Sequence, residues 1–426
     1  MARYIRFSES LLSEIRERTD LVALIQRDIP LRKTGKSFTG RCPFHEEKTG
    51  SFNVSPVRGT YKCFGCDARG DAIAWLVNHH GHSFKDAVLQ LASECGIPIP
   101  DDDQPRCDDG SGTRREQMRQ ALEDALRIYR SLLDQNQAAR EYLTNERSLA
   151  DETIARFELG MVGRSILEQL TERYSKDLLS DAGLVIQADT GRTYDRLRDR
   201  VIVPIYDHRS QLIGFAGRAF KDTGGKAPKY LNSPETELFH KGEHLYALNL
   251  AKASIRKAQH AIVVEGYFDV IALHQAGDDR VVAPMGTALT NSQARLLCSN
   301  AQTITFAFDG DKAGRSAALR AAAVMLEEIS DEKAVQFLFL PDNLDPDDFI
   351  RGHGLEHWQA ALNNAIPLSA FLNSFVSHGL DHDIPETQVK AACKAKPILA
   401  RIRQAPLFKA ALTARFEKSI RLSLQA

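Results

Sequence analysis

The sequence predicts a multidomain α+β protein with a small metal-binding domain, a mixed α/β domain, an α/β domain with a mainly parallel sheet, and a C-terminal helical subdomain. Two pairs of cysteine or histidine residues before residue 67 indicate the metal-binding domain. Apolar β-branched runs alternate with helical patterns between 261 and 349, which is typical of parallel strands buried on both faces. After residue 349 the apolar spacing is helical.

Length and composition limit the classes of protein. A chain of 426 residues is long enough for two or three domains with cores of their own. The net charge is −1, so affinity for nucleic acid has to come from local basic surfaces. No apolar run approaches the length of a membrane span, and residues 1–20 do not resemble a secretory signal. We therefore expect a cytoplasmic protein without membrane contact, whose seven cysteines are thiols or metal ligands.

Two ligand pairs near the N-terminus predict a zinc ribbon. Cys42 and His45 form a C-x₂-H pair, Cys63 and Cys66 form a C-x₂-C pair, and 17 residues lie between the pairs. A hairpin would bring three thiolates and one imidazole into a closed tetrahedral site, which is typical of structural zinc. Ordinary buried cysteines are the alternative, and the doubled spacing disfavours it. One structural Zn²⁺ is therefore expected, and the other cysteines should be dispensable: Cys95, Cys107, Cys298 and Cys393.

Basic and aromatic residues are interleaved around these ligands. The basic residues are Arg32, Lys33, Lys36, Lys48, Arg58 and Lys62, and the aromatic residues are Phe44, Phe52, Tyr61 and Phe64. Phosphate pairing combined with base stacking suits single-stranded nucleic acid. We expect most of these rings to form the core of so small a domain, and Tyr61 to be the ring that stacks on bases.

Acidic residues follow three of the predicted strands in the α/β domain. Glu265 follows 262–264, Asp309 and Asp311 follow 304–308, and a third pair follows 335–340, namely Asp345 and Asp347. Carboxyl ends of parallel strands meet at one edge of a sheet, so these carboxylates should converge. Converging carboxylates repel one another unless cations lie between them, and hard oxygen ligands at an open site suit Mg²⁺. Solvated loop aspartates are the alternative, which three clusters after buried strands disfavour.

Four motifs around these acids resemble a TOPRIM domain of the version found in bacterial DnaG-type primases. They are Glu265-Gly266-Tyr267-Phe268-Asp269-Val270, Met285-Gly286-Thr287-Ala288-Leu289-Thr290, Phe308-Asp309-Gly310-Asp311-Lys312-Ala313-Gly314 and Asp345-Pro346-Asp347-Asp348. The Cys42–Cys66 segment is similar to the primase zinc-binding domain, with Gly50 where the family usually has proline. Topoisomerases and some nucleases share the acidic pattern.

A basic run resembles the primase segment thought to follow the template backbone. Arg196, Arg198 and Arg200 stand at alternate positions, and on an extended segment they would share one face. The interspersed aspartates allow a solvated face with salt bridges as the alternative. Arg147 lies in a turn similar to the family's Arg-Gly-Leu turn, and Arg218 lies in a predicted strand. The resemblance implies that all five arginines bind substrate or template.

The loop Pro228–Thr236 is a second specific match to the family. Polar, bounded by prolines and flanked by lysines, it should face a polyanion. Lys229 and Lys241 could bind triphosphate oxygens, while Tyr230 and Asn232 could contact base or sugar. An ordinary surface loop is the alternative, which does not explain the position of the whole run just before the acidic domain.

The resemblance implies an enzyme that copies a single-stranded DNA template into a short RNA primer from ribonucleoside triphosphates. Two or three Mg²⁺ or Mn²⁺ ions would bind the five acids that follow the strands. The implied catalytic residues are Glu265, Asp269, Asp309, Asp311 and Lys241. Whether Glu265 acts as a base or orients a metal-bound water stays open. A TOPRIM topoisomerase or nuclease, or a non-catalytic single-strand DNA adaptor, remain the alternatives.

The expected domains follow from breaks in the pattern. Prolines, glycines and three consecutive aspartates between 97 and 115 indicate a flexible linker. The predicted boundaries are a zinc-binding domain at 1–100, a linker at 101–113, an N-terminal polymerase subdomain with the basic segment at 114–242, the TOPRIM catalytic domain at 243–365 and a helical subdomain at 366–426. The family's replicative helicase is an expected partner, although we recognise no helicase-binding domain in the sequence.

Overall fold

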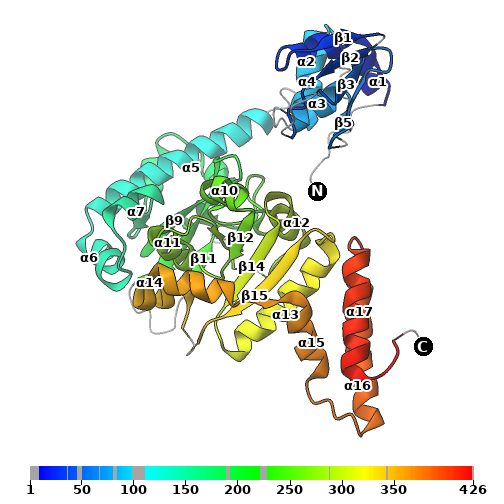
Figure 1. Cartoon of the computed structure of the whole chain (residues 1–426). Coiled ribbons are helices and arrows are strands. Elements are labelled where there is room, and N and C mark those ends of the chain that lie inside the picture. The colour runs from blue at the N-terminus through cyan, green and yellow to red at the C-terminus, as the bar shows by residue number, and fades with distance from the viewer. Residues whose placement is uncertain are drawn as a thin grey trace. The chain divides into compact units, whose positions relative to one another are not determined.

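The computed structural model divides into two compact units, Met1–Gly112 and Thr113–Ala426 (Figure 1). It describes residues 9–35, 37–45, 50–66, 68–79, 84–97, 111–188, 192–220, 228–286, 288–341 and 344–424. Lys36, Lys48, Thr287 and residues 98–110, which include most of the predicted linker, lie outside these ranges. Within the described ranges, no helix combines the length and the apolar composition that crossing a bilayer requires.

The N-terminal unit is a five-stranded antiparallel sheet with helices packed on one face. The strands pair in chain order: β1 (Arg32–Thr34), β2 (Ser37–Gly40), β3 (Phe52–Ser55), β4 (Thr60–Cys63) and β5 (Arg69–Gly70). The helices are α1 (Glu9–Arg18), α2 (Leu21–Gln26), α3 (Ala72–Asn78) and α4 (Phe84–Glu94). Alternate strand residues such as Phe52 and Val54 point inward and are fully buried, which is the pattern of a sheet with one solvated face.

Tyr61 lies inside this core, so the expectation that its ring stacks on bases is wrong. Its side chain is 1% exposed. The ring stacks on Phe52 with centroids 5.2 Å apart and meets the edge of Trp75 at 5.5 Å. Register explains the difference, because Tyr61 is paired with Val54 on the inward face of the sheet.

The second unit begins with the long helix α5 (Ser111–Asp134) and a four-stranded antiparallel sheet. The sheet order is β11 (Tyr230–Asn232), β10 (Leu212–Ala219), β9 (Arg200–Tyr206) and β6 (Gly160–Val162). Short elements surround it: α6 (Gln137–Glu141), the π-helical turn η1 (Tyr142–Glu146), α7 (Asp151–Arg156), α8 (Leu167–Thr171), α9 (Lys176–Asp181) and the hairpin of β7 (Val185–Gln187) and β8 (Thr193–Asp195). Tyr129 of α5 packs edge-on against Phe215 of β10, which joins helix and sheet in one core.

A mainly parallel sheet follows, as the sequence predicts. Its order is β13 (Val281–Val282), β12 (His260–Val263), β14 (Thr303–Phe308), β15 (Ala334–Phe339) and β16 (Ile366–Pro367), and only β16 is antiparallel. The helices between the strands are α10 (Leu248–Ala258), α11 (Tyr267–Gln275), α12 (Asn291–Asn300), α13 (Lys312–Glu328) and α14 (Pro346–Asn363). Apolar residues of α11 and α14 share one core with Ile262 and Ala307, whereas those of α10, α12 and α13 share another with Val263 and Phe306. The helices therefore cover both faces, which explains the unbroken apolar strands.

Three C-terminal helices complete the unit: α15 (Leu368–Ser377), α16 (Pro385–Arg401) and α17 (Pro406–Ile420). Phe371 of α15 packs against Phe337 of β15 with ring centroids 4.6 Å apart. Arg401 of α16 pairs with Glu327 of α13 at 2.6 Å. The carboxylate of Asp331 accepts hydrogen bonds from the first backbone N–H groups of α17. These contacts fix the bundle to the parallel sheet.

Candidate active site

The predicted acids stand where the parallel strands end. Glu265 follows β12 and Asp309 follows β14. Asp311 caps α13 and accepts from the backbone N–H of Gly314 at 2.7 Å, and Asp345 caps α14 in the same way through Asp348. At Gly314 a Cβ atom would lie 2.2 Å from the carbonyl oxygen of Asp309, so only glycine permits this turn. Strand ends and helix caps together place the acids at one edge of the sheet.

Burial and mutual repulsion both reduce the acidity of these groups. Burial and the neighbouring Asp309 and Asp311 raise the pKa of Glu265. Burial together with Asp345 and Asp311 raises the pKa of Asp309. Each shift means that the folded protein disfavours the charged form, as expected for carboxylates that lack a counter-ion. The carboxylate oxygens of these acids are ligands that suit divalent cations.

The acids form a looser group than the zinc ligands described below. Among the described residues, the four zinc ligands are the one group of at least three potential ligands close enough to hold a metal ion, and their ligand atoms lie within 4.8 Å of one another. Asp269 is tied locally, since its carboxylate accepts from the backbone N–H of Gly266 at 2.9 Å. Burial, followed by Asp345 and Asp347, raises the pKa of Asp269 to about 7. Cations would therefore have to draw these side chains together or bind some of them through water.

Asp347 differs from the other acids because two arginines pair with it, although burial still raises its pKa. It is 1% exposed. Arg147 Nη1 lies 2.8 Å from its Oδ2, and Arg351 Nε lies 2.9 Å from its Oδ1. Arg147 also donates to the hydroxyl of Tyr142 at 3.0 Å and stacks 5.1 Å from the ring centroid of Phe268. The structure thus brings Asp347 and Arg147 together as a buried ion pair. The contact of Arg351 with Asp347 could not be predicted from the sequence.

The three arginines of the basic run do not share one face, contrary to expectation. Arg200 opens β9, whereas Asp199 before it has a left-handed φ of 51° that breaks the extended segment. Arg200 is 5% exposed, and its guanidinium donates to the carbonyl oxygens of Gly217, Pro228 and Lys229. Arg198 is exposed and lies over the ring of Tyr194 at 4.9 Å. Only part of the run therefore remains available to a template.

The loop after residue 227 is fixed by the same arginines. Besides the contacts of Arg200 to its first residues, Arg196 Nε donates to the carbonyl oxygen of Asn232 at 3.1 Å. The Asn232 side chain donates to the carbonyl oxygen of Met285 at 3.1 Å and accepts from the Tyr267 hydroxyl at 3.0 Å. Asn232 therefore joins β11 to the acidic domain, and its amide is already occupied. Tyr267 belongs to a recognised motif, but its link to Asn232 could not be read from the sequence.

Three cations near this loop have no acidic partner among the residues that the structure describes. Arg218 is 7% exposed, donates to the Tyr230 hydroxyl and lies between the rings of Tyr230 and Phe268 at 4.8 and 5.1 Å. Its Nε is buried without a hydrogen bond. Neither Lys229 nor Lys241 forms an ion pair with any described residue. A buried guanidinium without a counter-charge is costly, so Arg218 favours an anion beside it.

A cavity of about 350 Å³ opens beside Glu265. Its walls come from β12, β14, the segment after β13 and α13, and include Pro284, Leu289, Phe308 and Arg320. Arg320 is the basic residue of this lining, and it opposes the rise in the pKa of Glu265.

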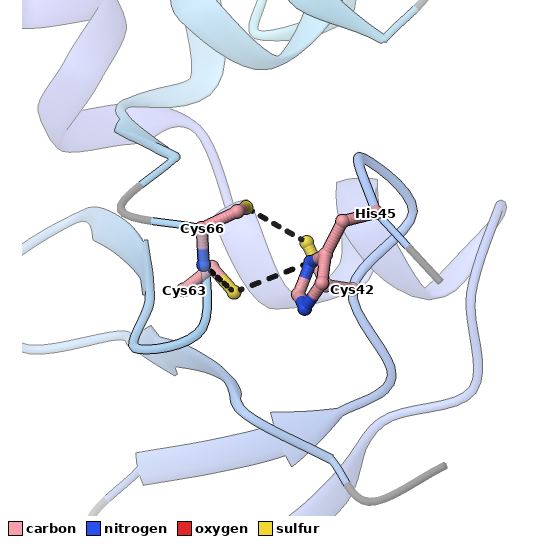
Figure 2. Close-up of side chains that lie close together, drawn as sticks. All are labelled: Cys42, His45, Cys63 and Cys66. Carbon is pink, nitrogen blue, oxygen red and sulfur yellow. Dashed lines mark hydrogen bonds between the residues drawn. The ribbon is translucent and has the colours of Figure 1, made fainter. Parts of the chain in front are cut away.

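The four predicted zinc ligands lie together in the N-terminal unit (Figure 2). Cys42 Sγ lies 3.7 Å from Cys66 Sγ, and Cys63 Sγ lies 3.8 Å from His45 Nδ1. Burial opposes ionisation of Cys63, but hydrogen bonds from Ser51 and from backbone N–H groups outweigh it and lower the pKa to about 7. A thiolate stabilised by N–H donors beside two further sulfurs and an imidazole is the donor set of a tetrahedral zinc site.

Models of three protein families match the chain. The CHC2 zinc finger covers residues 7–106, the N-terminal domain of the DNA primase catalytic core covers 128–252, and a Toprim-like domain covers 262–350. The DNA primase of Neisseria meningitidis serogroup B is 39% identical over 398 residues, which are 92% of this chain and 67% of that protein. The DNA primase of Escherichia coli K12 is 37% identical over 410 residues, or 93% and 69% of the two chains.

Solved structures agree with these matches. The Aquifex aeolicus primase, comprising its zinc-binding and RNA polymerase domains, is 31% identical, covers 98% of both chains and gives a TM-score of 0.64. A DnaG primase catalytic domain bound to single-stranded DNA is 35% identical, covers 72% of this chain and 99% of its own, and gives a TM-score of 0.66. The zinc finger and the Toprim-like domain indicate that the chain binds Zn²⁺ and a divalent metal. The chain therefore belongs to the DnaG-type bacterial DNA primases, the enzymes that synthesise RNA primers for DNA replication.

Proposed function

We propose that primer synthesis occurs at the carboxyl edge of the parallel sheet, with Glu265, Asp309, Asp311 and Asp345 as the ligands of two or three Mg²⁺ or Mn²⁺ ions. The observation that supports this most is the position of the four acids, which follow β12 and β14 or cap α13 and α14 at one edge of the sheet. Burial and the neighbouring carboxylates raise the pKa of Glu265 and Asp309 there. Bound divalent ions would neutralise the triphosphate and favour ionisation of the primer 3′-hydroxyl. Glu265 either accepts that proton or orients a metal-bound water.

We assign binding of the triphosphate to Arg218, Lys229 and Lys241. The guanidinium of Arg218 is buried without a carboxylate, and the two lysines are without acidic partners in the described structure. Tyr230 supports Arg218 through its hydroxyl. Transfer of a phosphoryl group depends chiefly on positioning and charge neutralisation, so cations held in place are the expected contribution of the protein.

Template binding is assigned to Arg198 and to the outer face of the N-terminal sheet. One row of directly paired residues crosses all five strands of that face, and the described residues of the strands include no acid. The row is Arg32, Thr39, Asn53, Lys62 and Arg69. Phe64, which follows β4, is 73% exposed, and Lys62 Nζ lies 5.6 Å from its ring centroid. A row that contains three cations beside an exposed ring suits a single strand of nucleic acid. We assign the role of holding this sheet together to a zinc ion bound by Cys42, His45, Cys63 and Cys66.

A primer-synthesis assay tests the assignment of the acids. The protein is incubated with single-stranded DNA, labelled ribonucleoside triphosphates and Mg²⁺, and short RNA is the expected product. Asp309→Asn and Asp311→Asn should each reduce the rate by at least about a hundredfold, the size expected when a transition-state charge loses its partner. Asp383→Asn, at an exposed aspartate in the turn between α15 and α16, is the matched control. Normal synthesis by either test variant would show that the metal assignment is wrong.

A further inference from the structure

The C-terminal helices are much more basic than the rest of the chain. Residues 385–424 contain nine lysines and arginines but two glutamates, in a chain whose net charge is −1. These residues form α16 and α17, which lie side by side at the end of the second unit (Figure 1). The basic residues are Lys390, Lys394, Lys396, Arg401, Arg403, Lys409, Arg415, Lys418 and Arg421.

Internal contacts account for only a few of these charges. Arg401 pairs with Glu327, and Lys394 lies over the ring of Phe375 at 5.6 Å. Arg415, Lys418 and Arg421 are exposed and form no ion pair with any residue that the structure describes. The one acid of α17, Glu417, accepts from the backbone N–H of Leu424 at 2.8 Å and so caps the chain after the helix. The charge of this helix is therefore directed to solvent.

The unpaired cations lie along one side of α17. Positions 407, 411, 414 and 418 recur at intervals of three or four residues, so they share one face of the helix. Position 421 follows the last residue of α17 as its C-cap. All five positions are exposed, and Ala411 and Ala414 make the middle of this face low. Arg415, also exposed, adjoins Ala411 and Lys418 at the same spacing. Short side chains between cations allow the backbone of a polyanion to approach closely.

The absence of exposed rings on this face indicates which kind of polyanion it fits. Surfaces for single strands combine cations with aromatic rings on which bases stack. The described part of α16 and α17 contains two aromatic side chains, and Phe416 is fully buried while Phe408 is half-buried. Phosphates of a double helix need cations but no stacking.

We propose that the α17 basic face, defined by Arg415, Lys418 and Arg421, binds the phosphates of a double helix, and that its occupant is the RNA–DNA hybrid that the enzyme makes. The inference extends primer synthesis, since the growing hybrid has to leave the carboxyl edge of the sheet. It does not depend on which acids bind the metal. The contact is independent of base sequence and weakens as salt rises.

Binding of a short RNA–DNA hybrid, followed by fluorescence anisotropy over a range of salt concentrations, tests the proposal. The test variant is Arg415→Gln with Lys418→Gln in the full chain. The control is Lys176→Gln with Lys257→Gln, two exposed lysines on α9 and α10, which removes the same charge. The slope of log affinity against log salt should become shallower by roughly 1.8 in the test variant, about 0.9 for each lost phosphate contact. The slope should change by less in the control variant.

Two outcomes would overturn the proposal. One is a salt slope and hybrid affinity equal to those of the control variant. The other is an equal loss of affinity for single-stranded DNA, because the face would then bind single strands or act only through net charge. Thermal unfolding shows whether the double variant is folded, and Lys418→Gln alone, with an expected change of roughly 0.9 in slope, repeats the test with less disturbance. These measurements follow binding and unfolding only, so their outcome is separate from the test of the metal ligands by primer synthesis.

Discussion

The acids at the carboxyl edge of the sheet fall into two groups according to their charged neighbours. Burial and, after it, the surrounding carboxylates raise the pKa of Glu265 and Asp309. Asp347 instead lies between the guanidinium groups of Arg147 and Arg351. The sequence places all of them after strands and therefore treats them alike. It could not separate them, because Arg147 is 200 residues away from Asp347 along the chain.

This difference predicts opposite effects on stability. In buffer without added divalent metal, Asp309→Asn should leave the free energy of unfolding unchanged or raise it, because it removes a repelled charge. Asp347→Asn should lower it by about 3–5 kcal/mol, because it leaves two arginines against a neutral partner in a buried site. Urea unfolding of both variants, with Asp383→Asn as control, measures the contrast. Equal stability of the Asp347 and Asp309 variants would return Asp347 to the group of open metal ligands.

Burial rather than motif decides which aromatic residues of the N-terminal sheet face solvent. Four rings stand near the zinc ligands in the sequence, and strand register turns Phe52 and Tyr61 inward. Phe64 follows the last residue of β4 and is exposed. The existence of the sheet and of its basic side chains could be predicted from the sequence. The face that each ring occupies depends on the strand register, which the spacing of the zinc ligands does not determine.

Phe64→Ala should therefore weaken binding of single-stranded DNA to the N-terminal unit. The expected loss is about 1–3 kcal/mol, the contribution of one base stacked on a ring. Val57→Ala, at a position that is 83% exposed, is the matched control for loss of apolar surface. Fluorescence anisotropy with a short oligonucleotide gives both affinities. If the two variants bind equally well, the exposed ring has no part in template binding.

The zinc ligands determine the stability of the same element. Small β-sheet domains rarely have enough core, and structural zinc contributes roughly 10–16 kcal/mol in such domains. A strong chelator should unfold the N-terminal unit and leave the second unit folded, since the two are separate compact bodies. The near-ultraviolet circular dichroism signal of Trp75 should be lost, and the melting transition of the second unit should stay unchanged. Metal analysis that finds no zinc in freshly prepared protein would contradict the assignment.

At the scale of the whole molecule, the sequence predicts the order of the parts better than their internal contacts. The strand and helix patterns predicted the parallel sheet, and the spacing of the ligand pairs predicted the zinc ribbon. The contacts of Arg200 to Gly217 and to the 228–229 segment, and the link from Asn232 to Met285, join segments that are far apart in sequence. Periodicity and local motifs carry no information on such pairs, so these residues were expected to touch template or substrate.

The division into two units predicts how the reaction depends on their connection. If the N-terminal unit selects the start site on the template, its effective concentration at the second unit is set by the segment that joins them. A protease site introduced between residues 101 and 109, followed by cleavage, should therefore lower the initiation rate steeply at low protein concentration. Extension of a supplied RNA primer should be nearly unchanged, because the proposed triphosphate and metal ligands all belong to the second unit. Excess N-terminal unit should restore initiation in proportion to its concentration. Equal loss of initiation and extension after cleavage would mean that the N-terminal unit also takes part in elongation.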